Sequence, residues 1–374
     1  MMLESVINKY RKLRENGAFN VLLRPGVVSN YLAYQKEIAA RPLIMTSTPP
    51  GMEIELTNRC NLACIQCLRS RGLKPYALGD MDFDNFKRIL AQFPHVMNLC
   101  LNGFGEPLMH KQFFDIVAYT RRVRPWCKIG IYSNGMLLDA EKAHRLMDCG
   151  VAEVDISLDA AHPDTYHRVR RGGKLDVVHD NIKRLVRIKR KSRARFPLVG
   201  MNFVMLNENE GELVPFIEHA AEFGVDFVNC ITYASYDWGF VNRRSVDSYR
   251  RELDAAAERM AALGVRCKSF PSSDLSWSDP KQPFGCRFFW GESLRITYAG
   301  DVTLGCCVPF KETFSYGNTL ERPFSEIWNN ERFQENRRLA RRHAPPSPAC
   351  ASCDAFCKRF FDGVTPSGSS SAAS

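Results

Sequence analysis

Residues 51–67 read GMEIELTNRCNLACIQC, an apolar-rich run followed directly by three cysteines. Residues 51–56 predict a buried strand, and Cys60, Cys64 and Cys67 lie just beyond its carboxyl end, where α/β folds place their functional sites. Three thiolates on one compact loop can bind three irons of a cubane cluster and leave the fourth iron open to a ligand. Two other interpretations fit the spacing: a zinc site, which lacks a local fourth ligand, and three cysteines on one face of a buried helix.

Strand-like and helix-like segments alternate after residue 51. Strand-like apolar segments recur near 95–102, 127–135, 152–159, 197–205 and 225–233. Amphipathic helical spacing falls between them, at 81–93, 111–123, 140–150, 176–193 and 210–223. Six strands separated by helices predict parallel βαβ units with right-handed crossovers. Periodicity alone does not decide whether the sheet closes into a barrel.

The composition is that of a folded protein with a basic surface. The 374 residues are 45% hydrophobic and 25% charged, which excludes a wholly disordered chain, and the net charge is +10. No apolar run approaches the roughly 18 residues of a membrane span, and the charged N-terminus lacks the apolar core of a signal peptide. We therefore expect a cytoplasmic protein. The basic runs 183–195 and 332–342 have no interleaved aromatic residues, which favours solvated helix faces or an anionic small substrate over a nucleic-acid surface.

The chain divides into five expected segments. They are an N-terminal helical extension (1–50), an α/β core (51–235), a helix and linker (236–283), a cysteine-rich domain (284–361) and a disordered tail (362–374). The linker is rich in Ser, Asp and Pro, and the tail in Ser and Gly, which are typical of such segments.

Fourteen cysteines in a cytoplasmic protein indicate metal binding or catalysis rather than disulfides. A second group lies in residues 284–361, a segment too short for a large core, and a bound metal usually stabilises such a unit. Its members are Cys286, Cys306, Cys307, Cys350, Cys353 and Cys357. A zinc ribbon also fits this spacing. The isolated cysteines are expected to be small buried side chains: Cys100, Cys127, Cys149, Cys230 and Cys267.

Several motifs in order resemble those of the radical S-adenosylmethionine (SAM) superfamily. CxxxCxxC follows the first strand, Gly103-Phe-Gly105-Glu106-Pro107 follows the second and is similar to a GGEP motif, and Ser133-Asn134-Gly135 ends the third. Ile156-Ser157-Leu-Asp159, Val169-Arg170 and Asn181-Ile182 then resemble the family's "SLD … IR … NI" run. Two positions depart from the pattern: Gln66 replaces the usual aromatic residue before the third cysteine, and Phe104 is inserted between the glycines.

The resemblance implies a partial (β/α)6 barrel and a site for SAM beside a [4Fe–4S] cluster. The cluster is expected on Cys60, Cys64 and Cys67, and the methionyl amino group of SAM on the backbone of the Gly105 motif. The full set of expected SAM-binding residues is Gly105, Glu106, Pro107, Ser133, Asn134, Ser157, Asp159 and Arg170. Ser157 is expected near the ribose or carboxylate of SAM. Arg170 suits the carboxylate because a guanidinium can donate to both oxygens. The ordinary alternatives are a helix N-cap for Asp159 and a surface charge for Arg170.

The C-terminal pattern resembles the SPASM/twitch extension of radical SAM enzymes. Between the cysteines lie Gly300-Asp-Val, Tyr316-Gly-Asn and Ser325-Glu-Ile-Trp328, as in that extension. The resemblance implies one auxiliary [4Fe–4S] cluster on Cys286, Cys306, Cys350 and Cys353. Cys307 is an alternative to Cys306, and no cysteine follows Cys357 to complete a second auxiliary cluster.

The resemblance implies a radical SAM enzyme that cleaves SAM reductively, forms a 5′-deoxyadenosyl radical and abstracts hydrogen from a substrate. With the auxiliary cluster as electron acceptor, we expect a two-electron oxidation of a small metabolite, with a flavodoxin- or ferredoxin-type reductant. Alternatives are an epimerase, with Cys230 as a candidate hydrogen donor, a peptide maturase, or a non-catalytic iron–sulfur or zinc protein. From their position after the sixth strand, we expect the substrate site to include Tyr233, Tyr236, Asp237 and Trp238.

Overall fold

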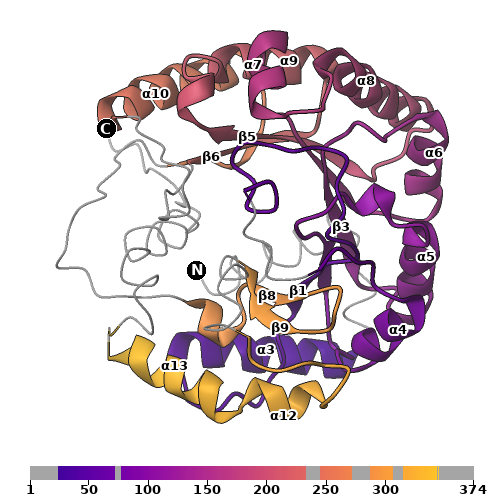
Figure 1. Cartoon of the computed structure of the whole chain (residues 1–374), viewed down its shortest axis with the longest axis vertical. Helices are drawn as coiled ribbons and strands as arrows, with labels where there is room; N and C mark the ends of the chain where they lie inside the picture. The colour runs from indigo at the N-terminus through magenta and orange to yellow at the C-terminus, as the bar shows by residue number, and fades with distance from the viewer. Residues whose placement is uncertain are drawn as a thin grey trace, which may run out of the picture.

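One curved sheet organises the described part of the chain. The computed structural model describes residues 24–71, 77–232, 245–271, 287–305, 315–342 and 344. The sheet has nine strands in the order β7-β6-β5-β4-β3-β2-β1-β8-β9, and helices cover its outer face in a wide arc (Figure 1). β7 and β9 are the two ends of this order and do not pair with each other, so the barrel is partial rather than closed.

Seven parallel strands build most of the sheet. Their bounds are β1 Gly51–Ile54, β2 Asn98–Leu101, β3 Lys128–Ser133, β4 Glu153–Ser157, β5 Leu198–Met205, β6 Phe227–Thr232 and β7 Cys267–Ser269. Each pairs in parallel with the strand next to it in the chain. The expected α/β fold, a partial (β/α)6 barrel with β1 to β6 in sequence order, is thereby confirmed.

The helices between these strands pack on the outer face of the sheet. They are α4 Phe83–Ala91, α5 Phe113–Val123, α6 Ala140–Asp148, α7 Pro163–Val169, α8 Leu175–Lys191, α9 Leu213–Phe223 and α10 Val246–Leu263, with short 3-10 turns η1 Pro107–Met109 and η2 Asn207–Asn209. Aspartates cap two of them: the carboxylate of Asp82 accepts from the N–H groups of Asp84 and Asn85, and Asp139 accepts from Lys142. No described helix is long and apolar enough to cross a membrane.

The two faces of the sheet differ in chemistry. Because side chains alternate along a strand, one set faces the helices and is apolar, including Leu99, Ile131 and Val154. The other set faces the inside of the barrel and is largely polar. There Asn229 donates from Nδ2 to Asp155 Oδ1 at 2.8 Å and to the Oδ1 of Asn202 at 2.7 Å.

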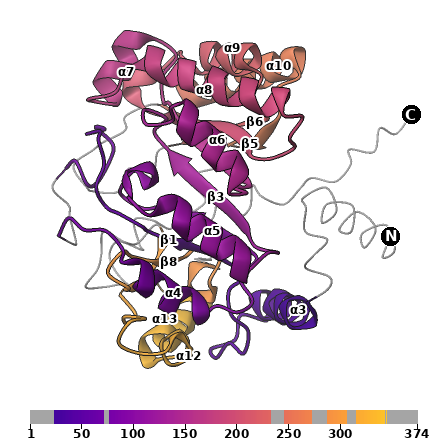
Figure 2. The ribbon, with the colours of Figure 1, turned by 90° about the vertical axis from the view of Figure 1, so that its right-hand side faces the viewer.

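The C-terminal part of the chain extends the same sheet. β8 (Leu294–Ile296) pairs in parallel with β1, and β9 (Val302–Leu304) pairs antiparallel with β8. The Arg295 guanidinium on β8 bonds to the Glu53 carboxylate on β1. η3 (Arg287–Trp290), α12 (Phe324–Trp328) and α13 (Glu331–Arg341) complete this part, and α12 and α13 lie beside α3 (Pro25–Ala40) at one end of the molecule, far from α7 (Figures 1 and 2).

A fully buried arginine fastens the C-terminal helices to the N-terminal segment. Arg337 on α13 donates to the carbonyl oxygens of Phe289, Leu43 and Trp328 and to Asn329 Oδ1, at 2.8–3.0 Å. Four oxygen acceptors thus surround a charge that has no solvent contact.

Candidate functional site

The first cysteine group forms a loop at the carboxyl end of β1. A turn is closed by the bond from Cys67 N to Cys64 O at 3.2 Å, and the N–H of Leu62 points to Cys60 Sγ at 3.5 Å. The three thiols are free and interact electrostatically with one another. Burial raises the pKa of Cys60, and raises that of Cys64 to about 11. Among the described residues, no three His, Cys, Asp or Glu side chains converge on a single metal ion.

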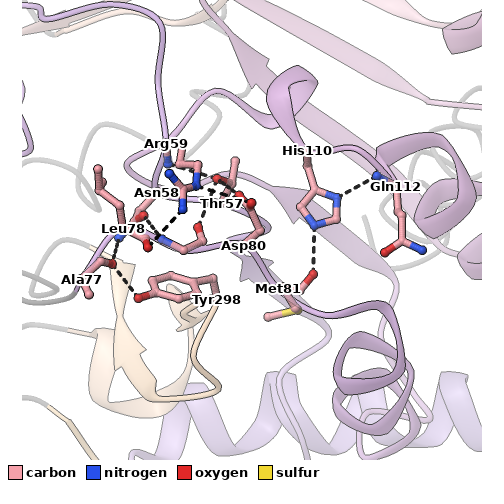
Figure 3. Close-up of polar contacts among 11 residues, drawn as sticks. Thr57, Asn58, Arg59, Ala77, Leu78, Asp80, Met81, His110, Gln112 and Tyr298 are labelled. Carbon is pink, nitrogen blue, oxygen red and sulfur yellow. Dashed lines mark hydrogen bonds and ion pairs between the residues drawn. The ribbon is translucent and has the colours of Figure 1, made fainter.

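The residues that lead into this loop are held by residues 77–81, which we call the strap (Figure 3). Thr57 Oγ1 donates to Asp80 Oδ1 at 2.5 Å, and Asn58 exchanges hydrogen bonds with Ala77 O and Gly79 N at 2.7 and 2.9 Å. Arg59 Nε lies 3.4 Å from Asp80 Oδ2. Residues 57–59, which directly precede Cys60, are therefore held in place by side-chain contacts with the strap.

The strap is in turn supported by residues far away in the sequence (Figure 3). Tyr298, in the turn between β8 and β9, donates its hydroxyl to Ala77 O at 2.6 Å, and its ring fills the space beside Gly79. At the other end His110 donates from Nε2 to Met81 O at 2.9 Å, while its Nδ1 accepts from the N–H of Gln112 at 3.2 Å. The C-terminal part of the chain thus touches the support of the cysteine loop.

The Gly103–Pro107 motif packs directly on the backbone that precedes Cys60. A Cβ at Gly105 would lie 2.2 Å from Thr57 O and 2.6 Å from Arg59 O, so only glycine allows this approach. The next residue, Glu106, donates its N–H to Arg59 O at 2.8 Å. Glu55, the residue directly after β1, accepts from the N–H of Phe104 at 2.7 Å, which holds the inserted residue against the chain there.

Glu106 connects the loops that follow β2 and β3. Its buried carboxylate accepts from Ser133 Oγ at 2.8 Å, from Asn134 N at 2.7 Å and from Leu108 N at 3.2 Å. Burial outweighs these bonds and raises the pKa of Glu106. Asn134 donates from Nδ2 to Asn61 Oδ1 at 2.8 Å and lies 3.8 Å from Cys60 Sγ. The predicted residues Glu106, Ser133 and Asn134 therefore meet at the cysteine loop.

A second polar group surrounds Cys64. Asp159, fully buried with a φ of +57°, accepts from Gln66 Nε2 at 2.7 Å and from Val204 N at 2.9 Å, and forms an ion pair with Arg170. Asp159 is not a helix N-cap, and Arg170 is not a surface charge. Gln66, the departure from the family pattern, is thus tied to the predicted SAM-binding pair. The roles of Asp159 and Arg170 toward SAM stay predictions.

The remaining predicted residues lie outside these two polar groups. Ser157 ends β4 on the inner face and is half-buried. Pro107 starts η1, and Asn181 donates to Gly135 O at 2.8 Å, which holds the turn after β3. The structure does not place Cys230 on the inner face: its thiol is buried on the helix side and contacts Cys267, so it is not positioned to return hydrogen to a substrate.

Several predictions lie outside the described residues. They concern the second cysteine group (Cys286, Cys306, Cys307, Cys350, Cys353 and Cys357) and the positions Tyr233, Tyr236, Asp237 and Trp238. Conversely, sequence reasoning missed Glu55 and Tyr298. The position of Tyr298 depends on the pairing of β8 with β1, which no local pattern signals.

Four loops together form one candidate site. Free cysteines on the loop after β1, backed by polar loops after β2, β3 and β4, form a site at the carboxyl edge of a parallel barrel. Buried donors without partners within the described chain, Tyr166 Oη and Arg170 Nε, lie beside Cys64, and their chemistry fits an anionic sulfur cluster there.

Comparison with known proteins identifies the family. Residues 54–220 match the model of the radical SAM superfamily, and residues 286–354 match SPASM, an iron–sulfur cluster-binding domain. The chain belongs to the radical SAM superfamily and has a C-terminal SPASM domain. The family's cofactors are SAM and a [4Fe–4S] cluster, with auxiliary iron–sulfur binding in the SPASM domain.

Relatives align over most of the chain. A PqqA peptide cyclase of Streptomyces rochei is 30% identical over 75% of both chains. A tungsten-containing aldehyde ferredoxin oxidoreductase cofactor-modifying protein of Pyrococcus furiosus is 28% identical over 80% of this chain and 86% of its own. The crystal structure of Streptococcus suis SuiB bound to precursor peptide SuiA superposes with a TM-score of 0.65 at 14% identity, over 89% of this chain and 79% of SuiB, which shows a shared fold.

Proposed function

We propose that this radical SAM enzyme oxidises a peptide, removing two hydrogen atoms to form a crosslink. The observation that carries the proposal is the similarity to a PqqA peptide cyclase over three quarters of both chains. This revises the first expectation, a small metabolite, in favour of the peptide maturase alternative. The expected two-electron balance stays, because closing a crosslink also removes two electrons and two protons.

In this proposal some residues of the site bind the cluster and others bind SAM. When bound, the cluster and SAM supply the 5′-deoxyadenosyl radical that abstracts hydrogen. Cys60, Cys64 and Cys67 hold the cluster in this proposal. The Gly105–Pro107 backbone, fixed against residues 57–59, offers the surface for the amino group of SAM. Since Glu106 joins this loop to Ser133 and Asn134, a shift in one loop moves the other.

The remaining electron needs an acceptor. We assign it to an auxiliary [4Fe–4S] cluster on Cys286, Cys306, Cys350 and Cys353, and the reducing electron to a flavodoxin- or ferredoxin-type donor. The SPASM match over residues 286–354 supports this assignment.

A small metabolite remains a second candidate substrate. The relative from Pyrococcus furiosus is described as a cofactor-modifying protein, and it aligns over 86% of its length. Dehydrogenation of a small molecule needs the same radical and the same electron acceptor, so substrate tests must include both classes.

The test uses the full chain, reconstituted with iron and sulfide under anaerobic conditions and supplied with SAM, dithionite and a synthetic PqqA peptide. About eight irons per chain are expected, four for each cluster. We expect 5′-deoxyadenosine and a peptide lighter by two hydrogen atoms.

Two matched variants separate the steps. C60A/C64A/C67A should form no deoxyadenosine, whereas C350A/C353A should form it without releasing oxidised peptide. Deoxyadenosine with unchanged peptide would refute this substrate class and direct the test to small molecules. Binding of zinc in place of iron, with SAM left uncleaved, would refute the proposal that the chain carries out radical SAM chemistry.

A further inference from the structure

Two buried hydrogen-bond donors beside Cys64 have no acceptor within the described chain. They are the hydroxyl of Tyr166 and the Nε–H of Arg170. Tyr166 has no exposed surface, and Arg170 is 8% exposed. Buried donors are normally paired, because leaving one unpaired is costly, so an unpaired donor in a folded protein indicates a missing acceptor.

The backbone fixes Arg170 opposite Cys64. Ala63 donates its N–H to Arg171 O at 2.9 Å, and Ile65 donates to Val169 O at 3.0 Å. These two bonds flank Cys64 on one segment and Arg170 on the other, so the residues face each other. The guanidinium already gives one N–H, from Nη2, to Asp159. Its Nε–H is left over for a different acceptor.

Tyr166 reaches the same place from one helical turn earlier. Arg170 donates its N–H to Tyr166 O at 2.7 Å, so both side chains project from the C-terminal end of α7. The phenol interacts electrostatically with Arg170, Cys64 and Asp159. Gly173 closes over the ring: a Cβ there would lie 3.0 Å from the hydroxyl oxygen. The hydroxyl is therefore enclosed on the side of Gly173.

We propose that Tyr166 and Arg170 donate hydrogen bonds to sulfur atoms of the [4Fe–4S] cluster at Cys64 and raise its reduction potential. This inference rests on the proposed function, because it takes the cluster to be bound by this loop. Reduction adds negative charge to the cluster, and a donor to sulfur stabilises the more negative state. Tyr166 and Arg170 act on the cluster itself, and neither needs to touch the substrate.

The test measures the potential rather than turnover. Holoenzyme and the variant Tyr166→Phe are titrated with reductant, without SAM, and the reduced cluster is followed by electron paramagnetic resonance. Its signal is the one missing from C60A/C64A/C67A. Loss of the donor should make reduction about tenfold less favourable, a shift of about 59 mV to lower potential for a one-electron couple. Tyr34→Phe, which changes a buried tyrosine on α3 at the far end of the molecule, should leave the potential unchanged (Figure 1).

A second measurement applies to the wild-type chain. Holoenzyme labelled with ¹⁵N only in arginine should show a ¹⁵N coupling to the reduced cluster in pulsed electron paramagnetic resonance, and R170K should lose it. An unchanged potential in Tyr166→Phe, or no arginine coupling in the wild type, overturns the proposal. Either result leaves the proposed function standing, whereas failure of the wild-type loop to bind an iron–sulfur cluster refutes the function itself.

Discussion

Replacing Gly105 by alanine tests whether the close contact between two loops builds the SAM site. Gly105 does not have a positive φ, so alanine causes no backbone strain of its own. The Cβ would, however, lie 2.2 Å from Thr57 O, whereas real Cβ contacts stay beyond about 3.0 Å. The two backbones must therefore separate by about 0.8 Å.

The size of the effect follows from what the separation breaks. A shift of about 0.8 Å would lengthen the 2.8 Å bond from Glu106 N to Arg59 O beyond hydrogen-bonding range. Losing that bond lowers the free energy of unfolding by about 1 kcal/mol, and overpacking lowers it by about a further 1–3 kcal/mol. We expect Gly105→Ala to lower the free energy of unfolding by about 2–4 kcal/mol and to weaken SAM binding by at least about tenfold.

The assay pairs this variant with Gly51→Ala. At Gly51 the added Cβ meets its nearest atoms at 3.8 and 3.9 Å, an ordinary contact, and φ is not positive. Anaerobic urea unfolding followed by circular dichroism gives the stability, and equilibrium dialysis of the reconstituted proteins gives SAM affinity. If Gly105→Ala matches Gly51→Ala within about 0.5 kcal/mol and binds SAM equally well, the close packing does not shape the site.

Three further substitutions test other contacts. Arg337→Lys should lower the free energy of unfolding by about 2–4 kcal/mol, because an ammonium cannot reach four oxygens. The control Arg338→Lys, on the exposed side of α13, should change it by less than about 0.5 kcal/mol. Equal effects of the two variants in urea unfolding would contradict this. Burial raises the pKa of Asp155 to about 8, so the folded chain keeps a proton that the unfolded chain loses near pH 4. The contribution of Asp155 to stability therefore falls as pH rises from about 4 to 8, and Asp155→Asn should make the midpoint of urea unfolding depend less on pH over that range. An unchanged pH dependence in this variant would show that the carboxyl is ionised in the folded chain. Tyr298→Phe removes the bond to Ala77 O and should weaken SAM binding about fivefold by equilibrium dialysis, since about 1 kcal/mol of support for the strap is lost; unchanged affinity would show that the strap does not need it.

Much of the α/β core could be predicted because its signals are local. The apolar alternation around Ile131 and Val154, and the helical spacing between the strands, depend only on neighbours in the sequence. The strand pairing of Glu53 with Arg295 could not be found this way, because it joins segments separated by most of the chain. The short helix α7 was missed as well, since seven residues give too little periodicity.

The candidate site shows the same division. Cys60, Gly105 and Glu106 were predicted from motifs in order, and the structure brings them together. No local sequence pattern predicts the contact of Glu55 with Phe104 or that of Tyr298 with Ala77. The motif implied that Arg170 serves SAM, but only the structure shows that one of its donors is already used by Asp159.

The pairing of β8 with β1 sets an order of events during synthesis. β1 ends at Ile54, and the strand that completes its second side begins at Leu294, about 240 residues later. At roughly 5–20 residues per second, the ribosome needs roughly 12–50 s to deliver it. Throughout that time the strand leading to the cysteine loop presents a bare edge to other nascent chains. A chain truncated before Leu294 would keep this edge permanently, and we expect it to collect in the insoluble fraction of an expression culture, whereas the full chain stays in the soluble fraction.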